Sequence, residues 1–269
     1  MSASFLDDMM VRRRARIAAE YGALTPADRE RLACCSRPVR DFAAALRDRN
    51  DVAVIAEVKK ASPSAGAIAL ECEAGKQALH YQDGGAAAIS VLTEPESFGG
   101  SFHDLSDVAD AVDIPVLCKD FVVDPVQPFI ARGHGADAIL LMVSVLGAQT
   151  AHYVDIARTL GLTPLVEVIN PAELEVALKA GAEVIAVNNR DLHTLVVDAE
   201  AARKTVALAA ETGVTVVAAS GIKRRSDVEA AAAAGASAVL VGEALMRLAF
   251  PEDLLEELTG VARRAPVSG

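Results

Sequence analysis

The chain has no long apolar run and no leader of the secretory type. These absences argue against a membrane-spanning protein and against a secreted one. No stretch of its 269 residues approaches the ~20 apolar residues that a bilayer crossing requires. Residues 1–16 carry acidic and then basic side chains, with no apolar core between them of signal-peptide type. We therefore expect a cytoplasmic protein with no membrane partner.

The few cysteines predict neither a disulfide framework nor a metal site. Cys34 and Cys35 are adjacent, while Cys72 and Cys118 stand alone, so no C-x-x-C pair is present. We interpret Cys118 as a small buried hydrophobe rather than a catalytic thiol. The histidines never pair with cysteine at ligand spacing, and we interpret His193, which follows an apolar run, as a loop residue. We expect no metal.

Positive charge is also scarce, which argues against a nucleic-acid partner. The formal net charge is -11 and the sequence pI is near 5.0, whereas phosphate neutralisation requires clustered Lys and Arg. The only basic run is Arg12-Arg13-Arg14-Ala15-Arg16. We interpret this run as the solvated face of an N-terminal helix.

The apolar content that is present indicates one large core. The chain is 52% hydrophobic and 23% charged, and single α/β barrels commonly occupy about 250 residues. Residues up to about Arg49 read as helical with breaks near Gly22 and Pro38, and Thr25 is placed to cap a helix that begins at Pro26. We expect one domain over 1–269, with an N-terminal helical extension at 1–50 and a barrel at 51–260.

From Val52 onward, short apolar runs typical of strands alternate with segments typical of helices. Segments with helical periodicity separate the apolar runs, and Gly-Ala pairs that begin at Gly85, Gly135, Gly181 and Gly235 precede every second run. Continuously apolar runs suit a parallel sheet covered by helices, and no G-x-G-x-x-G follows the first one, so the pattern predicts a (β/α)8 TIM barrel. The eight runs are Ala53–Val58, Ala86–Leu92, Ile114–Cys118, Asp137–Val143, Pro164–Val168, Glu183–Val187, Val214–Ala219 and Ser237–Val241.

Polar side chains gather where these runs end, which is the catalytic end of such a barrel. Glu57 and Lys59 share a strand face with Ile55, so the first strand is expected to point an acid and an amine into the barrel mouth. A structural ion pair at Glu57–Lys59 and turn chemistry at Asn188-Asn189 are the alternatives. Five strand ends converge in this way, and the other four carry Lys119, Glu167, Asn188 with Arg190, and Ser220.

Two glycine-containing turns are typical of phosphate-binding sites. Ser220-Gly221 and Gly242-Glu243 follow the seventh and eighth runs, where barrels of this kind often bind phosphate on backbone N–H groups. Ser220 or Ser62 would add a hydroxyl, and Glu243 would have to turn its carboxylate away from an anion. Glycine before a helix also occurs without a ligand. These residues suggest a metal-free acid–base enzyme with a phosphorylated substrate.

Several segments, in order between residues 54 and 246, resemble the indole-3-glycerol-phosphate synthase family. An N-terminal helical extension is also typical of that family. Any one segment would be unspecific, but the combination is highly specific. The segments are E-V-K-K-A-S-P-S from Glu57, S-V-L-T-E from Ser90 with F-G-G-S from Phe98, C-K-D-F-V-V-D-P from Cys118, L-V-E-V from Leu165, N-N-R-D-L from Asn188, A-S-G-I from Ala219 and V-L-V-G-E-A-L-M from Val239.

The resemblance implies a cofactor-free lyase of tryptophan biosynthesis. It converts 1-(2-carboxyphenylamino)-1-deoxyribulose 5-phosphate to indole-3-glycerol phosphate, carbon dioxide and water by ring closure, decarboxylation and dehydration. By resemblance Lys119 is the general acid, Glu167 the base, Lys59 the group that assists loss of the hydroxyl, and Glu57 the carboxylate that orients the amines. The residues carried over as substrate contacts are Asn188, Ser220, Arg190, Phe98, Phe121 and Leu140, and those carried over to the phosphate are Ser62, Gly221, Gly242 and Glu243.

One position departs from the family pattern. Ala219 stands where members commonly carry glutamate, which leads us to expect a slower enzyme or a shifted pH optimum. Phosphoribosylanthranilate isomerase is an alternative, but its chemistry needs a thiol where this chain has Lys59. A non-catalytic phosphate-binding barrel is the other alternative, and only Ala219 favours it. We expect a monomer or a weak homo-oligomer.

Overall fold

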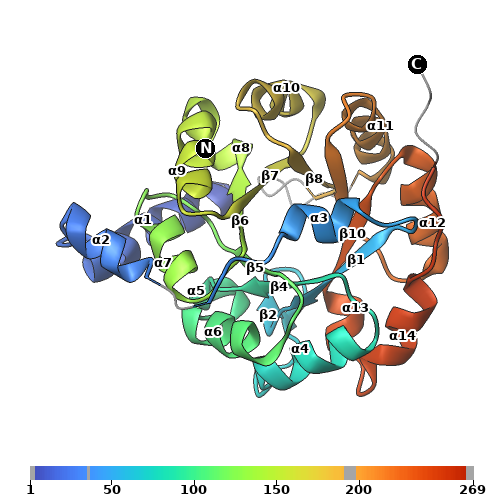
Figure 1. Cartoon of the computed structure of the whole chain (residues 1–269), viewed down its shortest axis with the longest axis horizontal. Helices are drawn as coiled ribbons and strands as arrows, with labels where there is room; N and C mark the ends of the chain where they lie inside the picture. The colour runs from blue at the N-terminus through green and yellow to red at the C-terminus, as the bar shows by residue number, and fades with distance from the viewer. Residues whose placement is uncertain (1–3, 35–36, 191–197, 265–269) are drawn as a thin grey trace.

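Eight parallel strands close into a barrel in the computed structural model, which describes residues 4–34, 37–190 and 198–264 (Figure 1). The strands follow one another around the ring in chain order, and β1 pairs with both β4 and β10 to close it. All eight predicted runs are confirmed, with ends that shift by a few residues. The barrel strands are β1 Ala53–Val58, β4 Ala88–Leu92, β5 Val116–Lys119, β6 Ala138–Met142, β7 Thr163–Val168, β8 Val184–Asn188, β9 Thr215–Ala219 and β10 Ala238–Val241.

The strands are buried on both faces, which explains their continuous apolar character. In β1, Ala53 and Ile55 pack into the barrel interior, whereas Val54 and Ala56 pack against the surrounding helices. Glu57 continues the inward face, as the period of two predicts. The first strand therefore delivers its charged end to the mouth of the barrel.

Helices cover the outside of the barrel and end where the sequence places glycine. Gly85, Gly135, Gly181 and Gly235 all have positive φ, between 76° and 102°, at the turns that lead into β4, β6, β8 and β10. The helices after β1 are α4 Ala74–Asp83, α5 Pro95–Phe98, α6 Phe102–Ala111, α7 Gln127–Gly133, α8 Val143–Leu146, α9 Thr150–Thr159, α10 Pro171–Lys179, α11 Ala199–Ala210, α12 Arg225–Ala234, α13 Glu243–Met246 and α14 Pro251–Leu258, with a 3-10 turn η1 at Gly147–Gln149.

Three helices precede the barrel: α1 Phe5–Tyr21, α2 Pro26–Leu32 and α3 Phe42–Arg47. Thr25 caps α2 as predicted, because its side chain accepts a hydrogen bond from the N–H of Asp28. Helix α3 lies in front of the barrel centre in Figure 1, and its Phe42 and Leu46 pack against the first residues of the strands. The short hairpin of β2 (Ala61–Ser62) and β3 (Gly66–Ala67) follows β1 at the opposite end.

The interpretation of residues 12–16 as a solvated face is wrong for Arg13. Its side chain is 3% exposed and forms a buried ion pair with Asp120, at 2.9 Å from Nε to Oδ1. Spacing explains the error, because Arg13 lies four residues from both Met9 and Ile17 and so shares their buried helix face. The arginines on either side of it, Arg12 and Arg14, are exposed.

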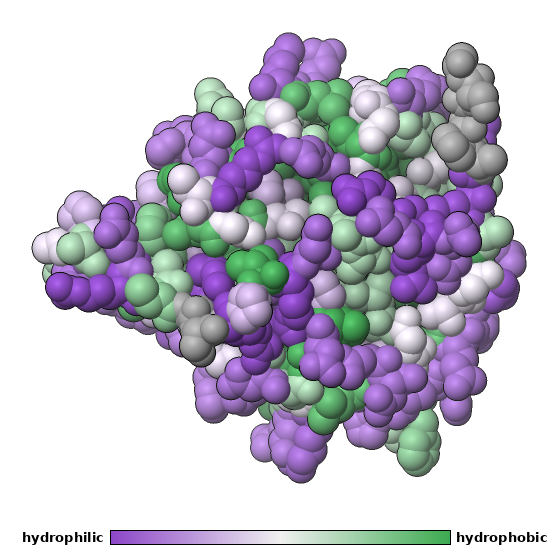
Figure 2. Space-filling model, viewed as in Figure 1, coloured by the Kyte–Doolittle hydropathy of each residue, from purple (hydrophilic) through white to green (hydrophobic). Residues whose placement is uncertain are grey.

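The surface mixes hydrophilic and hydrophobic side chains, and the α1–α2 arm projects at the left of this face (Figure 2). Large exposed apolar residues are present, such as Val11 and Phe250. Among the residues that the structure describes, no helix has the length and apolarity that a membrane crossing requires.

Candidate active site

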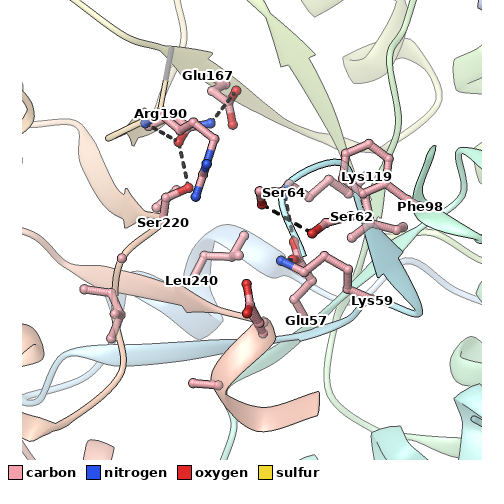
Figure 3. A pocket seen from close by; sticks show the side chains of 18 of the residues that line it. Glu57, Lys59, Ser62, Ser64, Phe98, Lys119, Glu167, Arg190, Ser220 and Leu240 are labelled. Atoms are coloured by element: carbon pink, nitrogen blue, oxygen red, sulfur yellow. Dashed lines mark hydrogen bonds and ion pairs between the residues drawn. The ribbon is translucent and has the colours of Figure 1, made fainter. Parts of the chain in front are cut away.

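A single carboxylate holds two ammonium groups at the mouth of the barrel. Glu57 Oε2 accepts a hydrogen bond of 2.7 Å from Lys119 Nζ, and Glu57 Oε1 lies 3.0 Å from Lys59 Nζ (Figure 3). The Glu57 side chain is 1% exposed, while those of Lys59 and Lys119 are 17% and 21% exposed. The prediction that these three side chains meet at one mouth of the barrel is confirmed by these distances.

Lys119 and Glu57 stabilise each other's charged forms. Burial alone would raise the pKa of Glu57, but the ammonium groups of Lys119 and Lys59 outweigh it and lower that pKa to about 2. Burial would likewise lower the pKa of Lys119, but Glu57 and Glu167 raise it above its ordinary value. Mutual repulsion between the lysines therefore does not dominate at Lys119, and this ammonium group keeps its proton at neutral pH.

A second carboxylate, Glu167, lies across the mouth at the end of β7. Its side chain is buried, and burial raises its pKa even though Lys119 and a hydrogen bond from Asn188 oppose the shift. The Asn188 Nδ2 donates to Glu167 Oε1 at 3.1 Å. A carboxylate with a raised pKa is a stronger base than an ordinary one, so this pair is suited to accept a proton.

The orientation of the Asn188 amide is fixed by its other contacts. Its Oδ1 accepts hydrogen bonds from Ser220 Oγ at 2.8 Å and from the Arg190 N–H at 3.0 Å. The oxygen is thus occupied on one side, which leaves the NH2 group to face Glu167. Asn188 and Ser220 were expected to contact substrate, and the structure gives them this further role of orienting Glu167.

Ser220 has a strained backbone, which sequence analysis did not predict. It is the one non-glycine residue with positive φ (69°) among those the structure describes, and Gly221 follows with φ 82°. The side-chain amide of Asn189 donates to the Ser220 carbonyl at 3.0 Å and supports this turn. Asn189 was noted at the end of the sixth run, with turn chemistry as the alternative, and nothing in the sequence predicts its bond to Ser220.

The proposed phosphate residues line the same cavity, which has a volume of about 710 Å³. Ser62 and Gly221 lie on its wall with Gly242 and Glu243. The Glu243 carboxylate pairs with Arg247 at 2.8 Å, and both residues line the cavity. The Ser62 hydroxyl caps its own hairpin by accepting from the Ala65 N–H at 3.1 Å.

Apolar side chains form another wall of the cavity. Phe98 and Phe121 pack with ring centroids 6.2 Å apart, and Leu140 also lines the space. Leu92, Met142 and Leu240 extend this wall and were not predicted. In Figure 3, Leu240 lies between the Glu57 group and the group formed by Glu167, Arg190 and Ser220. A flat aromatic group bound here would meet charged groups on either side.

A buried network ties the end of β5 to the N-terminal helix α1. Asp120 follows Lys119 directly and accepts hydrogen bonds from Arg13 and from Thr93 Oγ1, the latter at 2.8 Å. The Thr93 N–H in turn donates to the Lys119 carbonyl at 3.1 Å. Sequence analysis missed Arg13 and Thr93, although helical spacing gave a signal for Arg13.

The structure tests the interpretation of Cys118 but not that of His193. Cys118 is buried, and burial raises the pKa of its thiol to about 12, so a hydrophobe is the better description. Within the described ranges, the His, Cys, Asp and Glu side chains form no group of three placed to bind a metal ion. His193 lies outside the described residues, as do Asp191 and Leu192 of the N-N-R-D-L segment.

The fold and the site define a class: a (β/α)8-barrel enzyme with acid–base residues at the C-terminal ends of its strands. Two solved structures share this fold at low identity. Thiamine phosphate pyrophosphorylase from Pyrococcus furiosus matches with a TM-score of 0.59 and 17% identity, over 77% of this chain and 93% of that one. A 3-hexulose-6-phosphate synthase matches with a TM-score of 0.60 and 18% identity, over 77% and 98%.

Sequence comparison identifies the family. The family model described as indole-3-glycerol phosphate synthase matches residues 6–258. Proteins of that name from Mycobacterium avium, Mycobacterium bovis and Mycobacterium tuberculosis are each 44% identical over 257 residues, which is 95% of this chain and 94% of theirs. The chain belongs to the indole-3-glycerol phosphate synthase family, and so it is a decarboxylating lyase of tryptophan biosynthesis.

Proposed function

We propose that this chain closes the indole ring of 1-(2-carboxyphenylamino)-1-deoxyribulose 5-phosphate, with Lys119, Lys59, Glu57 and Glu167 as its catalytic residues. The products are indole-3-glycerol phosphate, carbon dioxide and water, and no cofactor takes part. One observation carries the proposal: Glu57 binds the ammonium groups of both lysines, and Glu167 lies across the same mouth.

Lys119 acts in ring closure. The aromatic carbon that bears the carboxylate attacks the keto carbon, and the keto oxygen must gain a proton as its negative charge develops. An ammonium group supplies that proton, and Glu57 keeps Lys119 charged until the oxygen approaches. The Glu57 carboxylate itself is 1% exposed, and this burial strengthens its electrostatic interaction with Lys119.

Lys59 and Glu167 act after ring closure. The bond to the carboxylate carbon breaks, and its electron pair returns to the ring as carbon dioxide leaves. Lys59 then protonates the departing hydroxyl, while Glu167 removes a proton to form the double bond of the indole. The raised pKa of Glu167 fits it for this step, and Asn188 holds its carboxylate toward the cavity.

The remaining cavity residues bind the substrate in this proposal. Phe98, Phe121 and Leu140 contact the anthranilate ring, while Asn188, Ser220 and Arg190 contact its polar groups. The phosphate lies at the turns of Gly221 and Gly242, with Ser62 and the backbone N–H of Glu243. Support comes from the fact that all of these residues line one cavity.

We also propose that residues 1–269 form one domain, with the extension at 1–50 docked on the barrel at 51–260. The buried Arg13–Asp120 pair and the packing of Leu6 and Met9 with Phe121 support this view. A cytoplasmic location, a monomeric or weakly homo-oligomeric state and the absence of a nucleic-acid partner complete the proposal.

The direct test is an assay with the purified chain. Incubation with 1-(2-carboxyphenylamino)-1-deoxyribulose 5-phosphate should form an indole chromophore and carbon dioxide in equal amounts. Phosphoribosylanthranilate serves as the comparison substrate and should not be consumed. Consumption of phosphoribosylanthranilate alone would favour the isomerase alternative, and consumption of neither would favour the non-catalytic barrel.

A further inference from the structure

Gly242 lies where β10 ends, beside the charged end of β1. Ala56 pairs with Val241 in the register of these two strands, so the next residue of β10 lies beside Glu57. Its φ is -122° and its ψ is -79°, so it is not one of the positive-φ glycines of this chain. Sequence analysis assigned this glycine to close approach of a phosphate.

The space in which a side chain would begin is already occupied. A Cβ built on Gly242 would lie 2.4 Å from Glu57 Oε1 and 3.1 Å from Lys59 Nζ. Non-bonded heavy atoms attract best at about 3.5–4.0 Å, so a carbon at this position would overlap the carboxylate oxygen. The neighbour of the missing side chain is therefore a proposed catalytic group of this protein.

Glu57 cannot move aside without losing a partner. Both of its oxygens are engaged, Oε1 with Lys59 and Oε2 with Lys119, and the side chain is 1% exposed. The oxygen that a Cβ would displace is the one that holds Lys59. Rotation of the carboxylate would also change its angle to Lys119, since both oxygens belong to one planar group.

We propose that Gly242 is a positioning residue, whose missing side chain provides the room in which Glu57 holds both lysines. The turn after β10 then performs two tasks, since it borders the proposed phosphate site and also fixes the carboxylate of the acid–base group. This inference rests on the proposed function for its kinetic part only. Its packing part concerns Glu57 and Gly242 whatever the substrate.

The experiment compares Gly242→Ala in two backgrounds, native and Glu57→Ala. In the native background, kcat should fall at least tenfold, which is a larger factor than any rise in KM or in the dissociation constant of inorganic phosphate. In the Glu57→Ala background, the same substitution should change kcat less than threefold, because the colliding carboxylate is gone. Equal losses of kcat in both backgrounds, or a loss confined to KM and phosphate affinity, would overturn the proposal.

Urea midpoints of the same four proteins provide a readout without turnover. Gly242→Ala should lower the midpoint in the native background and leave it unchanged in the Glu57→Ala background; an equal shift in both would overturn the packing claim. A native chain that lacks synthase activity but shows this coupling would remove the proposed function and leave the packing claim standing.

Gly84→Ala is the matched control, because its Cβ would lie 2.9 Å from Leu255 Cδ1, far from the mouth, and φ is again negative. This control should lower both midpoints equally.

Discussion

Lys119 Nζ donates a 2.7 Å hydrogen bond to Glu57 Oε2 inside the barrel mouth, and the charge of each residue depends on the other. The pKa of Lys119 is raised and that of Glu57 is lowered, although burial opposes both shifts. A group that donates a proton in ring closure must hold it beforehand. This contact therefore links Glu57 on β1 to Lys119, the proposed proton donor at the end of β5.

Glu57→Gln should lower the alkaline limit of activity. Without the carboxylate, burial dominates and the pKa of Lys119 falls, so the essential ammonium group loses its proton at a lower pH. The profile of kcat/KM against pH measures this shift, and its alkaline limb should move to lower pH. Glu175→Gln, on the exposed face of α10, is the control and should leave the limb in place. An unmoved limb in Glu57→Gln would contradict the role given to the pair.

Asn188→Ala should move the acid limb of the same profile to higher pH. The Asn188 hydrogen bond lowers the pKa of Glu167, so its removal lets burial raise that pKa further. The base must be ionised to accept a proton, and ionisation then requires a higher pH. Asn170→Ala removes the N-cap of α10 and should cost about 1 kcal/mol of stability without moving the limb. A limb that stays put in Asn188→Ala would exclude Glu167 as the group that it reports.

Ala219→Glu tests the position that departs from the family pattern. Ala219 pairs in register with Asn188 and packs in the barrel interior, so a carboxylate there would face the Glu167 region. A nearby negative charge raises the pKa of Glu167, and the acid limb should move to higher pH. Ala219→Gln adds similar bulk without charge and should not move it. Equal profiles for the two variants would show that charge at this position is irrelevant.

Arg13→Ala should destabilise the fold far more than an ordinary surface arginine variant. Loss of Arg13 leaves the Asp120 carboxylate buried without its charge partner, which typically costs about 3–5 kcal/mol. Arg16→Ala removes a half-exposed pair with Glu20 on the same helix and should cost at most about 1 kcal/mol. Urea unfolding measures both. Similar losses for the two variants would contradict the docking of the extension.

The fold could be predicted from the sequence because each of its elements obeys a local rule. Most of the eight runs are too continuously apolar for half-exposed antiparallel strands and suit a buried parallel sheet, and glycines such as Gly235 mark the turns into every second run. The strand-end rule also found Glu57, Lys59 and Lys119. These residues are separated along the chain, and only closure of the barrel brings them together.

The features that the sequence did not predict depend on contacts between segments that are far apart along the chain. Composition and local spacing carry no information about such contacts. Arg13 was assigned to solvent because its neighbours are charged, yet its partner Asp120 is far along the chain. The bond from Asn189 to the Ser220 carbonyl joins the ends of two strands in the same way. Gly242 was linked to a phosphate from its turn and from the family resemblance, and neither reveals that its crowded neighbour is the Glu57 carboxylate.

The most direct test of the account is the single-turnover rate of ring closure in Lys119→Ala, compared with Lys179→Ala on the exposed face of α10. Loss of a general acid costs about 10²–10⁴-fold, and the Lys119 variant should slow by that amount while the Lys179 variant keeps the native rate. Ring closure at the native rate in Lys119→Ala would contradict the central claim that this ammonium group protonates the keto oxygen.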